Sequence, residues 1–497
     1  MTTARSSAVL WRVATVTALL AYQGFSISAQ SPTAFPLLMT GDQAETLRQV
    51  WNEHRAYIPG EMLVKFRSGA APFSQQRALS VLRGRATERE EQWIGDVLLV
   101  RSVADADAPA AVSLLAQQPE VEWAQPNYFR HFAAAPNDPE YSRQWNFDAI
   151  KMPQAWDINP GSASTLTVAV VDSGVTATTQ TFSFPLWTGS RIESVPVPVA
   201  ISSDIPAARI QPGRDFAFWT GPVIDFDGHG SHVAGTILEE TNNAVGAAGI
   251  AYRARLLPVK ACVGYWDLQI LLSATNRPGF IDPRETGGCS DAAVAQAIRF
   301  AADNGAQVIN MSLGGDEVAP VLDDAIRYAV ARGAFVSIAA GNEFEDGNPT
   351  VYPAAYAASI DGAMAVGAVG RSNRRAYYSS TGSFVEISAP GGDFRDAGLS
   401  GVIYQTTLFP PDSDPFSVVR PRFDRYVVVA EQGTSMAAPH VAGVAALLYS
   451  QGINKSAAIE AALKHFAVDL GTSGRDNEYG FGLIDARASL RGLGLAR

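Results

Sequence analysis

Short apolar runs alternate with helical patterns through residues 136–497, and this alternation limits the fold more than any other feature. Strands buried on both faces are expected at 166–171, 308–311, 334–339 and 363–369, and helices at 291–304 and 322–332. Strand and helix in alternation predict an α/β fold, a parallel sheet with helices on both faces. Ligands of such sheets bind beyond the carboxyl ends of the strands, so the chemistry is expected in the loops that follow them.

Length and charge set further limits. A chain of 497 residues is too long for one ordinary domain and short for three, which predicts a main domain and a smaller module. The formal net charge of −11 argues against a nucleic-acid partner, because phosphate binding needs concentrated Lys and Arg.

The first 29 residues have the order of a secretory signal peptide. Arg5 and Arg12 precede an apolar run at 13–22, and small residues follow up to Ala29. This order predicts export, with cleavage near Ala29. A short membrane anchor is the structural alternative, although the run is too short to cross a bilayer. We expect a secreted protein, extracellular or periplasmic, with no stable membrane span.

A small module is predicted before the main domain. Residues 30–56 carry no strong pattern and are interpreted as a spacer. Strands are then expected at 62–66, 96–100 and 121–124, and helices at 74–82 and 111–117. This order is typical of a small α+β, ferredoxin-like module, which we assign to residues 57–132. The main domain is assigned to residues 133–497.

Three reactive side chains stand at the boundaries of predicted elements. An apolar strand ends on Asp172, His229 stands between two glycines before a helix, and Ser435 heads another helix. Taken alone, Asp172 is also explained as a turn former and Ser435 as a helix N-cap. His229 and His232 have the alternative of binding a metal, but no nearby Cys or third His completes such a site.

Together the three segments resemble the signature motifs of the subtilase family nearly residue for residue. They are V-A-V-V-D-S-G-V at 168–175, D-G-H-G-S-H-V-A-G-T-I at 227–237 and G-T-S-M-A-A-P-H-V-A-G-V-A-A-L-L at 433–448. The chain order Asp, His, Ser is that of subtilisin. The resemblance implies a doubly wound, subtilisin-like parallel sheet. It also implies a serine endopeptidase that acts on proteins or peptides and needs no cofactor for catalysis.

The resemblance implies a role for each residue. His229 would take the proton of the Ser435 hydroxyl during attack on the peptide carbonyl and later return it to the leaving amine. Asp172 would fix the tautomer of the imidazole and stabilise its charged form. Asn342, at the end of a buried strand, would be the oxyanion donor beside the Ser435 backbone N–H. His440, one turn into the serine helix, is expected to pack in the core.

The small module resembles the inhibitory propeptide of the same family. The resemblance lies in Y-I-P-G-E-M-L-V-K-F at 57–66 and P-E-V-E-W-A-Q-P-N-Y at 119–128. In that family the module assists folding, inhibits the active site and is then removed. An independent binding domain is the alternative.

Processing is expected between Tyr128 and Pro136. The segment P-N-D-P-E-Y-S-R-Q-W at 136–145 resembles the start of a mature subtilase domain, and an Ala-rich stretch at 133–135 precedes it. Until this cleavage the propeptide would act as the intramolecular inhibitor of a monomeric enzyme.

The resemblance also implies the substrate-binding residues, which are Ser312, Leu313, Gly314, Ala339, Ala340, Gly341 and Val351. The stretch 312–314 would pair with an extended peptide, and 339–341 would form the facing wall of the P1 pocket. Val351, near the pocket floor, predicts a preference for small or medium apolar P1 residues. The bond between Tyr352 and Pro353 is expected to be cis.

The sequence leaves a calcium site open. T-N-N-A-V-G-A-A-G at 241–249 resembles the calcium loop of the family. The implied ligands are Thr241, Asn243, Val245 and Ala247. However, Thr181 stands where the family has an acidic ligand, and residues 175–190 contain no carboxylate. Loss of a charged ligand would weaken the site.

Cys262 and Cys289 are the two cysteines of the chain. In an exported protein they would form one disulfide, and two buried thiols are the alternative. The bridge would contribute about 3–4 kcal/mol in the chain-entropy model. The two cysteines bracket one of three insertions relative to the family, which lie at 176–224, 263–288 and 393–430. Loops of this length usually line clefts or carry function.

Three competing interpretations are weighed against an active subtilase. A catalytically inactive, peptide-binding scaffold would not need the intact triad. A sedolisin-type acid peptidase would have Glu near the position of His229 and Asp at the oxyanion position, and this chain has neither. A structural surface protein would leave the propeptide unexplained.

Overall fold

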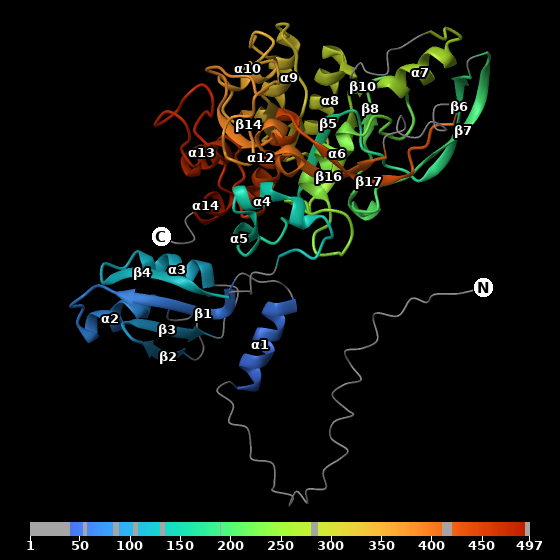
Figure 1. Cartoon of the computed structure of the whole chain (residues 1–497). Coiled ribbons are helices and arrows are strands. Elements are labelled where there is room, and N and C mark those ends of the chain that lie inside the picture. Colours follow the sequence, from blue (N-terminus) through green and yellow to red (C-terminus); the bar gives the residue numbers. More distant parts are fainter. Residues whose placement is uncertain are drawn as a thin grey trace, which may run out of the picture.

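The computed structural model describes residues 40–52, 57–82, 89–102, 108–129, 135–188, 190–279, 287–409 and 420–492. The predicted signal peptide lies outside these residues, as does most of the predicted processing stretch 133–135. Within the described ranges, no helix combines the length and apolar character needed to cross a bilayer. Figure 1 shows a small lobe, formed by the N-terminal elements, and a larger lobe formed by the rest.

The small lobe is a four-stranded antiparallel sheet with two helices. Its elements are β1 (Tyr57–Phe66), α2 (Pro72–Leu79), β2 (Arg89–Ile94), β3 (Val97–Ser102), α3 (Ala108–Ala116) and β4 (Val121–Tyr128). The strand order β2-β3-β1-β4 matches the predicted ferredoxin-like topology. Alternate residues of β1, among them Met62 and Val64, are buried in the apolar core of the lobe. The α+β arrangement is confirmed, with β2 as a strand that the sequence did not predict.

A helix also stands where the sequence suggested only a spacer. Helix α1 spans Gly41–Asn52, and Val50 on it is fully buried. Thr40 and Gln43 cap its start reciprocally, because each side chain accepts a hydrogen bond from the backbone N–H of the other. This Thr-x-x-Gln pair is a capping box, a local signal that was overlooked.

The large lobe is built on the predicted parallel sheet. Its seven strands lie in the order β15 (Ile387–Pro390), β14 (Ala363–Val369), β13 (Phe335–Ala339), β12 (Val308–Met311), β5 (Thr167–Asp172), β9 (Arg255–Lys260) and β8 (Arg214–Asp215). All neighbouring strands run parallel. The four predicted strands are present as β5, β12, β13 and β14.

Helices cover both faces of this sheet. On one face lie α6 (His229–Leu238) and α12 (Thr434–Ser450), and on the other α8 (Asp291–Asp303) and α9 (Pro320–Ala331). Strand β5 shows the reason, since Val168 and Val170 belong to the first core while Ala169 and Val171 belong to the second. A strand that buries both faces is expected to be apolar on both, and β5 is apolar from Val168 to Val171.

The insertions add a third apolar cluster. They form β6 (Gln180–Trp187), β7 (Ile192–Val199), α7 (Tyr265–Ala274), β16 (Ile403–Leu408) and β17 (Tyr426–Glu431). The ring centroid of Phe226 lies 5.7 Å from that of Phe184 and 4.9 Å from that of Phe423, which lies 6.1 Å from that of Trp266. Elements of all three insertions therefore share one core (Figure 1).

The remaining elements are short or peripheral. They are α4 (Trp145–Ala149), α5 (Met152–Trp156), β10 (Cys262–Val263), β11 (Gly288–Cys289), α10 (Ala354–Ala357), α11 (Phe394–Ala397), α13 (Ser456–Phe466) and α14 (Ala486–Arg491).

Candidate active site

Asp172 and His229 are brought together by the ends of two elements. Asp172 is the last residue of β5 and is 2% exposed, while His229 is the first residue of α6. The Nδ1 of His229 lies 2.7 Å from Oδ1 of Asp172. Because a carboxylate can only accept, this contact places the proton on Nδ1 and leaves Nε2 free to act as a base.

The surroundings of His229 favour its charged form. Burial opposes the positive charge, but the carboxylates of Asp172, Glu431 and Asp227 outweigh it and raise the pKa of the imidazole above its usual value. The side chain is still 32% exposed, so it can be reached from the pocket. This environment stabilises the imidazolium that a general base becomes during catalysis.

Ser435 lies in the first turn of α12, after Gly433. The φ of Gly433 is 154°, which ends the extended segment before the helix. The Ser435 hydroxyl donates to the backbone carbonyl of Ser312 at 3.4 Å, and the Ser312 hydroxyl donates to the Ser435 carbonyl at 2.8 Å. The long first contact holds the nucleophile weakly, so it can turn toward a base.

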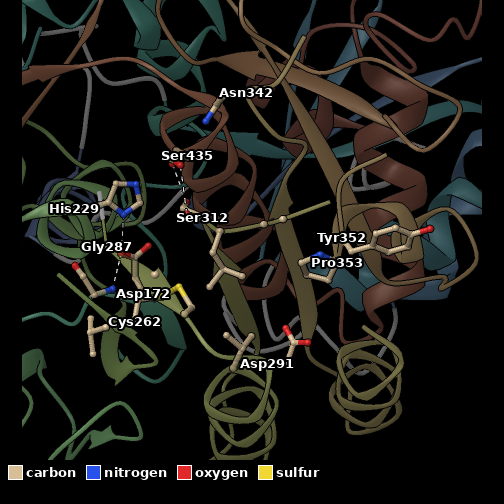
Figure 2. A pocket seen from close by; sticks show the side chains of 18 of the residues that line it. Asp172, His229, Cys262, Gly287, Asp291, Ser312, Asn342, Tyr352, Pro353 and Ser435 are labelled. Carbon is tan, nitrogen blue, oxygen red and sulfur yellow. Dashed lines mark hydrogen bonds and ion pairs between the residues drawn. A yellow bond between two sulfur atoms is a disulfide. The ribbon is translucent and has the colours of Figure 1, made fainter. Parts of the chain in front are cut away.

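Asn342 faces the same helix start. Its Oδ1 accepts hydrogen bonds from the backbone N–H of Thr434 at 2.9 Å and from the Thr434 hydroxyl at 3.0 Å. With the oxygen occupied, the amide Nδ2 is the group left to donate. Figure 2 shows Asn342 near Ser435, on the side of Ser435 away from Ser312.

One pocket of about 560 Å³ contains all four side chains. Its lining also includes Ser312, Leu313 and Gly314, three of the predicted substrate-binding residues. All described lining residues lie between Asp172 and Met436. In this structure the pocket is open to solvent, and no described residue of the small lobe lines it.

The other predicted substrate residues lie behind the pocket surface. Ala339, Ala340, Gly341 and Val351 are buried and are not among the described lining residues. Val351 still fills the space between two backbone segments, since a Cβ on Gly314 or on Gly341 would come within 2.7 or 2.5 Å of a Val351 methyl group. The Tyr352–Pro353 bond is cis, as expected.

The predicted disulfide forms part of the pocket wall. Cys262 and Cys289 are bonded, and they pair across the short antiparallel ladder of β10 and β11. Both cysteines line the pocket, and Figure 2 shows Cys262 below Asp172 and His229. Residues 263, 287 and 288 of the second insertion also line it, which places this insertion at the site.

Comparison with known proteins identifies the fold and the chemistry. Residues 163–482 match the model of the subtilase family of peptidases, and residues 44–127 match the fervidolysin N-terminal prodomain. This chain belongs to the subtilase family. It is a subtilisin-like serine endopeptidase that carries an N-terminal prodomain.

Individual relatives agree with this assignment. A thermophilic serine proteinase from a Bacillus species is 32% identical over 462 residues, which are 91% of this chain and 95% of that protein. An extracellular protease of Xanthomonas campestris is 30% identical over 413 residues, 78% of this chain and 62% of that protein. Fervidolysin from Fervidobacterium pennivorans, a keratinolytic enzyme related to subtilisin, is similar in fold with a TM-score of 0.52 at 22% identity. That similarity covers 88% of this chain and 61% of fervidolysin.

A buried polar network joins the strand and the helix that hold Asp172 and His229 in this subtilase. Asp225, fully buried, accepts from the hydroxyls of Ser173 and Ser231 at 3.0 and 2.7 Å. The Ser173 hydroxyl in turn accepts from the backbone N–H of Gly230 at 2.9 Å. Because Ser173 follows Asp172 and Gly230 follows His229, this network fixes the two triad candidates relative to each other.

Lys260 extends the network beneath the strand ends. Its fully buried ammonium donates to the backbone carbonyl of Ser173 and lies 3.1 Å from Oδ1 of Asp267. Burial opposes its charge, but nearby carboxylates, Asp267 first, raise the pKa of Lys260. The sequence analysis missed Lys260 and Asp225, because a buried charge inside an apolar run has no local pattern.

The predicted calcium loop is present, and it gathers carboxylates that the sequence analysis overlooked. Asp138 accepts from the backbone N–H groups of Asn242 and Asn243 at 2.9 and 3.3 Å. Asp204 accepts from the Asn243 side chain at 2.7 Å and from the Ala247 N–H at 3.1 Å. The sequence analysis considered only residues 175–190, which contain no carboxylate, and Asp204 lies beyond that stretch, inside the first insertion.

The two carboxylates are of the ligand type that calcium prefers, while the Asn243 side chain is hydrogen-bonded to Asp204 and to the Val245 N–H. Asp138 and Asp204 are 4% and 0% exposed, and within the described ranges neither forms an ion pair. Burial raises the pKa of Asp204 to about 6, and the charges of Asp138 and Glu240 add to the effect. Across the described residues no three His, Cys, Asp or Glu side chains form a metal site. Two carboxylates with amide and carbonyl oxygens are nevertheless ligands that calcium prefers.

Thr241, Val245 and His440 differ in their burial and in their hydrogen-bond partners. Thr241 exchanges hydrogen bonds with the backbone of Gly249, and Val245 is 40% exposed. His440 packs in the core as expected, with Nε2 2.8 Å from Nδ2 of Asn146, and burial lowers its pKa to about 4.

Proposed function

We propose that Asp172, His229 and Ser435 are the catalytic triad of a secreted serine endopeptidase that removes its own propeptide. The observation that carries this proposal is the 2.7 Å contact between Asp172 and His229 in the pocket that also holds Ser435 and Asn342. His229 is the base and Ser435 the nucleophile, because a serine hydroxyl needs a neighbouring base to attack a carbonyl.

The reaction follows from these positions. The Ser435 hydroxyl turns from Ser312 toward His229, transfers its proton to Nε2 and attacks the peptide carbonyl. The oxyanion accepts from Nδ2 of Asn342 and from the Ser435 backbone N–H, which lies in the first turn of α12 and has no hydrogen-bond acceptor among the described residues. His229 then protonates the leaving amine, and a water molecule hydrolyses the acyl-enzyme by the same steps.

Maturation is the second part of the proposal. The prodomain precedes the peptidase domain, as in a precursor whose active site is inhibited until cleavage between residues 128 and 136. The pocket open in this structure is where the C-terminal end of the prodomain would bind as an extended segment. The order of charge, apolar run and small residues at the N-terminus supports export.

Calcium is the third part. The carboxylates of Asp138 and Asp204, the Asn243 side chain and loop carbonyls at 241–247 would hold the ion. It would supply charge neutralisation and cross-link the N-terminal segment of the mature domain to the loop. No step of the hydrolysis depends on it.

The test compares wild type with Ser435→Ala, and with Ser473→Ala as a matched control at an exposed position. We expect wild type and Ser473→Ala to mature between residues 128 and 136 and to degrade casein. Ser435→Ala should keep its propeptide and leave casein intact, as read by mass spectrometry and a casein assay. Identical processing of all three chains without casein cleavage would contradict the proposal and indicate maturation by another protease.

A further inference from the structure

Five carboxylate side chains besides Asp172 line the active-site pocket, and among the described lining residues there is no Lys or Arg. They are Asp227, Asp291, Asp316, Glu317 and Glu431. A cleft lined by charges of one sign concentrates its field and attracts the opposite charge. The ligand of this cleft is a peptide chain, because the triad candidates lie in it.

Two of these carboxylates, Asp227 and Asp291, flank the wall that contains the disulfide. The wall is the β10–β11 ladder, in which Cys262 pairs with Cys289. At one end a Cβ on Gly264 would come within 2.6 Å of Oδ2 of Asp227. At the other end Asp291 follows Cys289 by two residues and begins α8. Figure 2 shows Asp291 at the opposite end of the pocket from Asn342.

Asp227 and Asp291 are both accessible at the surface of the pocket. Both residues are exposed, and among the described residues neither takes part in an ion pair. Asp227 accepts one hydrogen bond, from the backbone N–H of His229 at 3.2 Å. Their negative charges are therefore available to a bound chain.

The facing wall is different in character. There Val351 is buried behind the pocket surface, where it packs against Gly314 and Gly341 and makes the wall behind Gly314 apolar. Side chains of an extended peptide point alternately to opposite sides. If the P1 side chain, on the N-terminal side of the cleaved bond, points to the apolar wall, then the P2 and P4 side chains point to the wall with the carboxylates.

We propose that this cleft selects peptides with Lys or Arg at P2 and P4 and a small apolar residue at P1, with Asp227 recognising P2 and Asp291 recognising P4. The inference rests on the proposed function of the triad. It adds a substrate class, since cationic segments followed by a small residue would be cut before acidic or neutral ones.

The predicted processing segment of the chain has part of this character. Arg130 and His131 precede the Ala-rich stretch 133–135. Cleavage after Ala133 would place Arg130 at P4, Phe132 at P2 and Ala133 at P1. The segment thus carries a cation at the position assigned to Asp291 and an aromatic residue at the position assigned to Asp227.

The test uses quenched fluorescent peptides that differ only at P2 or P4, with Lys, norleucine or Glu there and Ala at P1. The mature enzyme is compared with Asp227→Asn and Asp291→Asn. Asp361→Asn is the control, because Asp361 is exposed and does not line the pocket. Asn keeps the oxygen that accepts the His229 N–H and removes only the charge.

We expect wild type and Asp361→Asn to prefer Lys over norleucine by on the order of fivefold in kcat/KM, the factor equivalent to about 1 kcal/mol for an accessible ion pair. Asp291→Asn should lose the preference at P4 alone and Asp227→Asn that at P2 alone. High salt should reduce both preferences in wild type.

Equal cleavage of all peptides by wild type, or preferences unchanged in both variants, would overturn the inference and leave the triad proposal standing. If wild type cleaves none of the peptides and matches Ser435→Ala, the triad proposal fails and this inference fails with it.

Discussion

Lys260 lies directly beside Asp172 in the parallel pairing of β9 with β5. Its ammonium is 0% exposed and contacts the Ser173 carbonyl and Asp267. The strand end that presents Asp172 is therefore held by a buried ion pair. Such a pair is costly to break, since removing one partner leaves the other charge buried and unpaired.

Lys260→Met should lower the free energy of unfolding by about 3–5 kcal/mol. Urea unfolding in the Ser435→Ala background, which prevents self-digestion, measures this loss. Lys455→Met is the control, because Lys455 is exposed and should change stability little. The double variant Lys260→Met/Asp267→Leu should recover part of the loss, and equal stability of Lys260→Met and Lys455→Met would contradict the prediction.

Asn342→Ala should lower kcat by about 10²–10³ while KM changes little, because the oxyanion donor acts mainly in the transition state. Steady-state kinetics on a peptide substrate checks this. The melting temperature should fall by no more than the loss of the two hydrogen bonds that the Asn342 side chain accepts from Thr434. A rise in KM with unchanged kcat would argue for a role in ground-state binding.

The acid limb of kcat/KM should lie above pH 6.5, the ordinary pKa of a histidine. His229 must be neutral to accept a proton, and its raised pKa keeps it protonated to higher pH. Activity therefore rises as pH increases through the raised pKa. A pH–rate profile on a neutral peptide gives the midpoint.

Glu431→Gln should move that midpoint to lower pH, because it removes a charge that favours the imidazolium. Asp361→Asn changes the same charge far from the pocket lining and should leave the midpoint in place. Identical pH–rate profiles for wild type and both variants would show that Glu431 does not affect the pKa of His229.

The variant Cys262→Ser/Cys289→Ser should lose about 3–4 kcal/mol of stability in the chain-entropy model. KM should also rise, because the ladder that the bridge joins is a wall of the pocket. Thermal unfolding and peptide kinetics with and without a reductant measure both effects. A reductant should lower the stability of wild type and leave that of the double variant unchanged.

Calcium should raise the melting temperature of wild type, and a chelator should reverse the rise. Calcium at a concentration 100 times its dissociation constant would add about 2.7 kcal/mol to the free energy of unfolding. Asp204→Asn should abolish this response with little loss of stability in the metal-free protein, since Asp204 is a buried charge there. A calcium response that survives in Asp204→Asn would place the ion elsewhere.

The central sheet could be predicted because its strands are buried on both faces. In β5 every residue from Thr167 to Asp172 is buried, so the apolar run is itself the signal. His229 and Ser435 could be predicted for a similar reason, since each begins a helix whose apolar residues give its position in the chain.

Features that depend on distant contacts could not be predicted in this way. Strand β2 contains charged residues and is a strand because it pairs with β3. Asp204 reaches the predicted calcium loop only because the first insertion folds back, and Asp138 reaches it from the predicted start of the mature domain. Pairings across such sequence distances leave no local periodicity.

The shared aromatic cluster around Phe226 and Phe423 has a consequence for anyone who recombines this enzyme with its relatives. Phe184, Trp266 and Phe423 come from three separate insertions, and each covers the apolar surface of another. A chimaera that takes one insertion alone would expose the faces that the other two cover. The three insertions therefore form one packing unit, and a chimaera should exchange all three together.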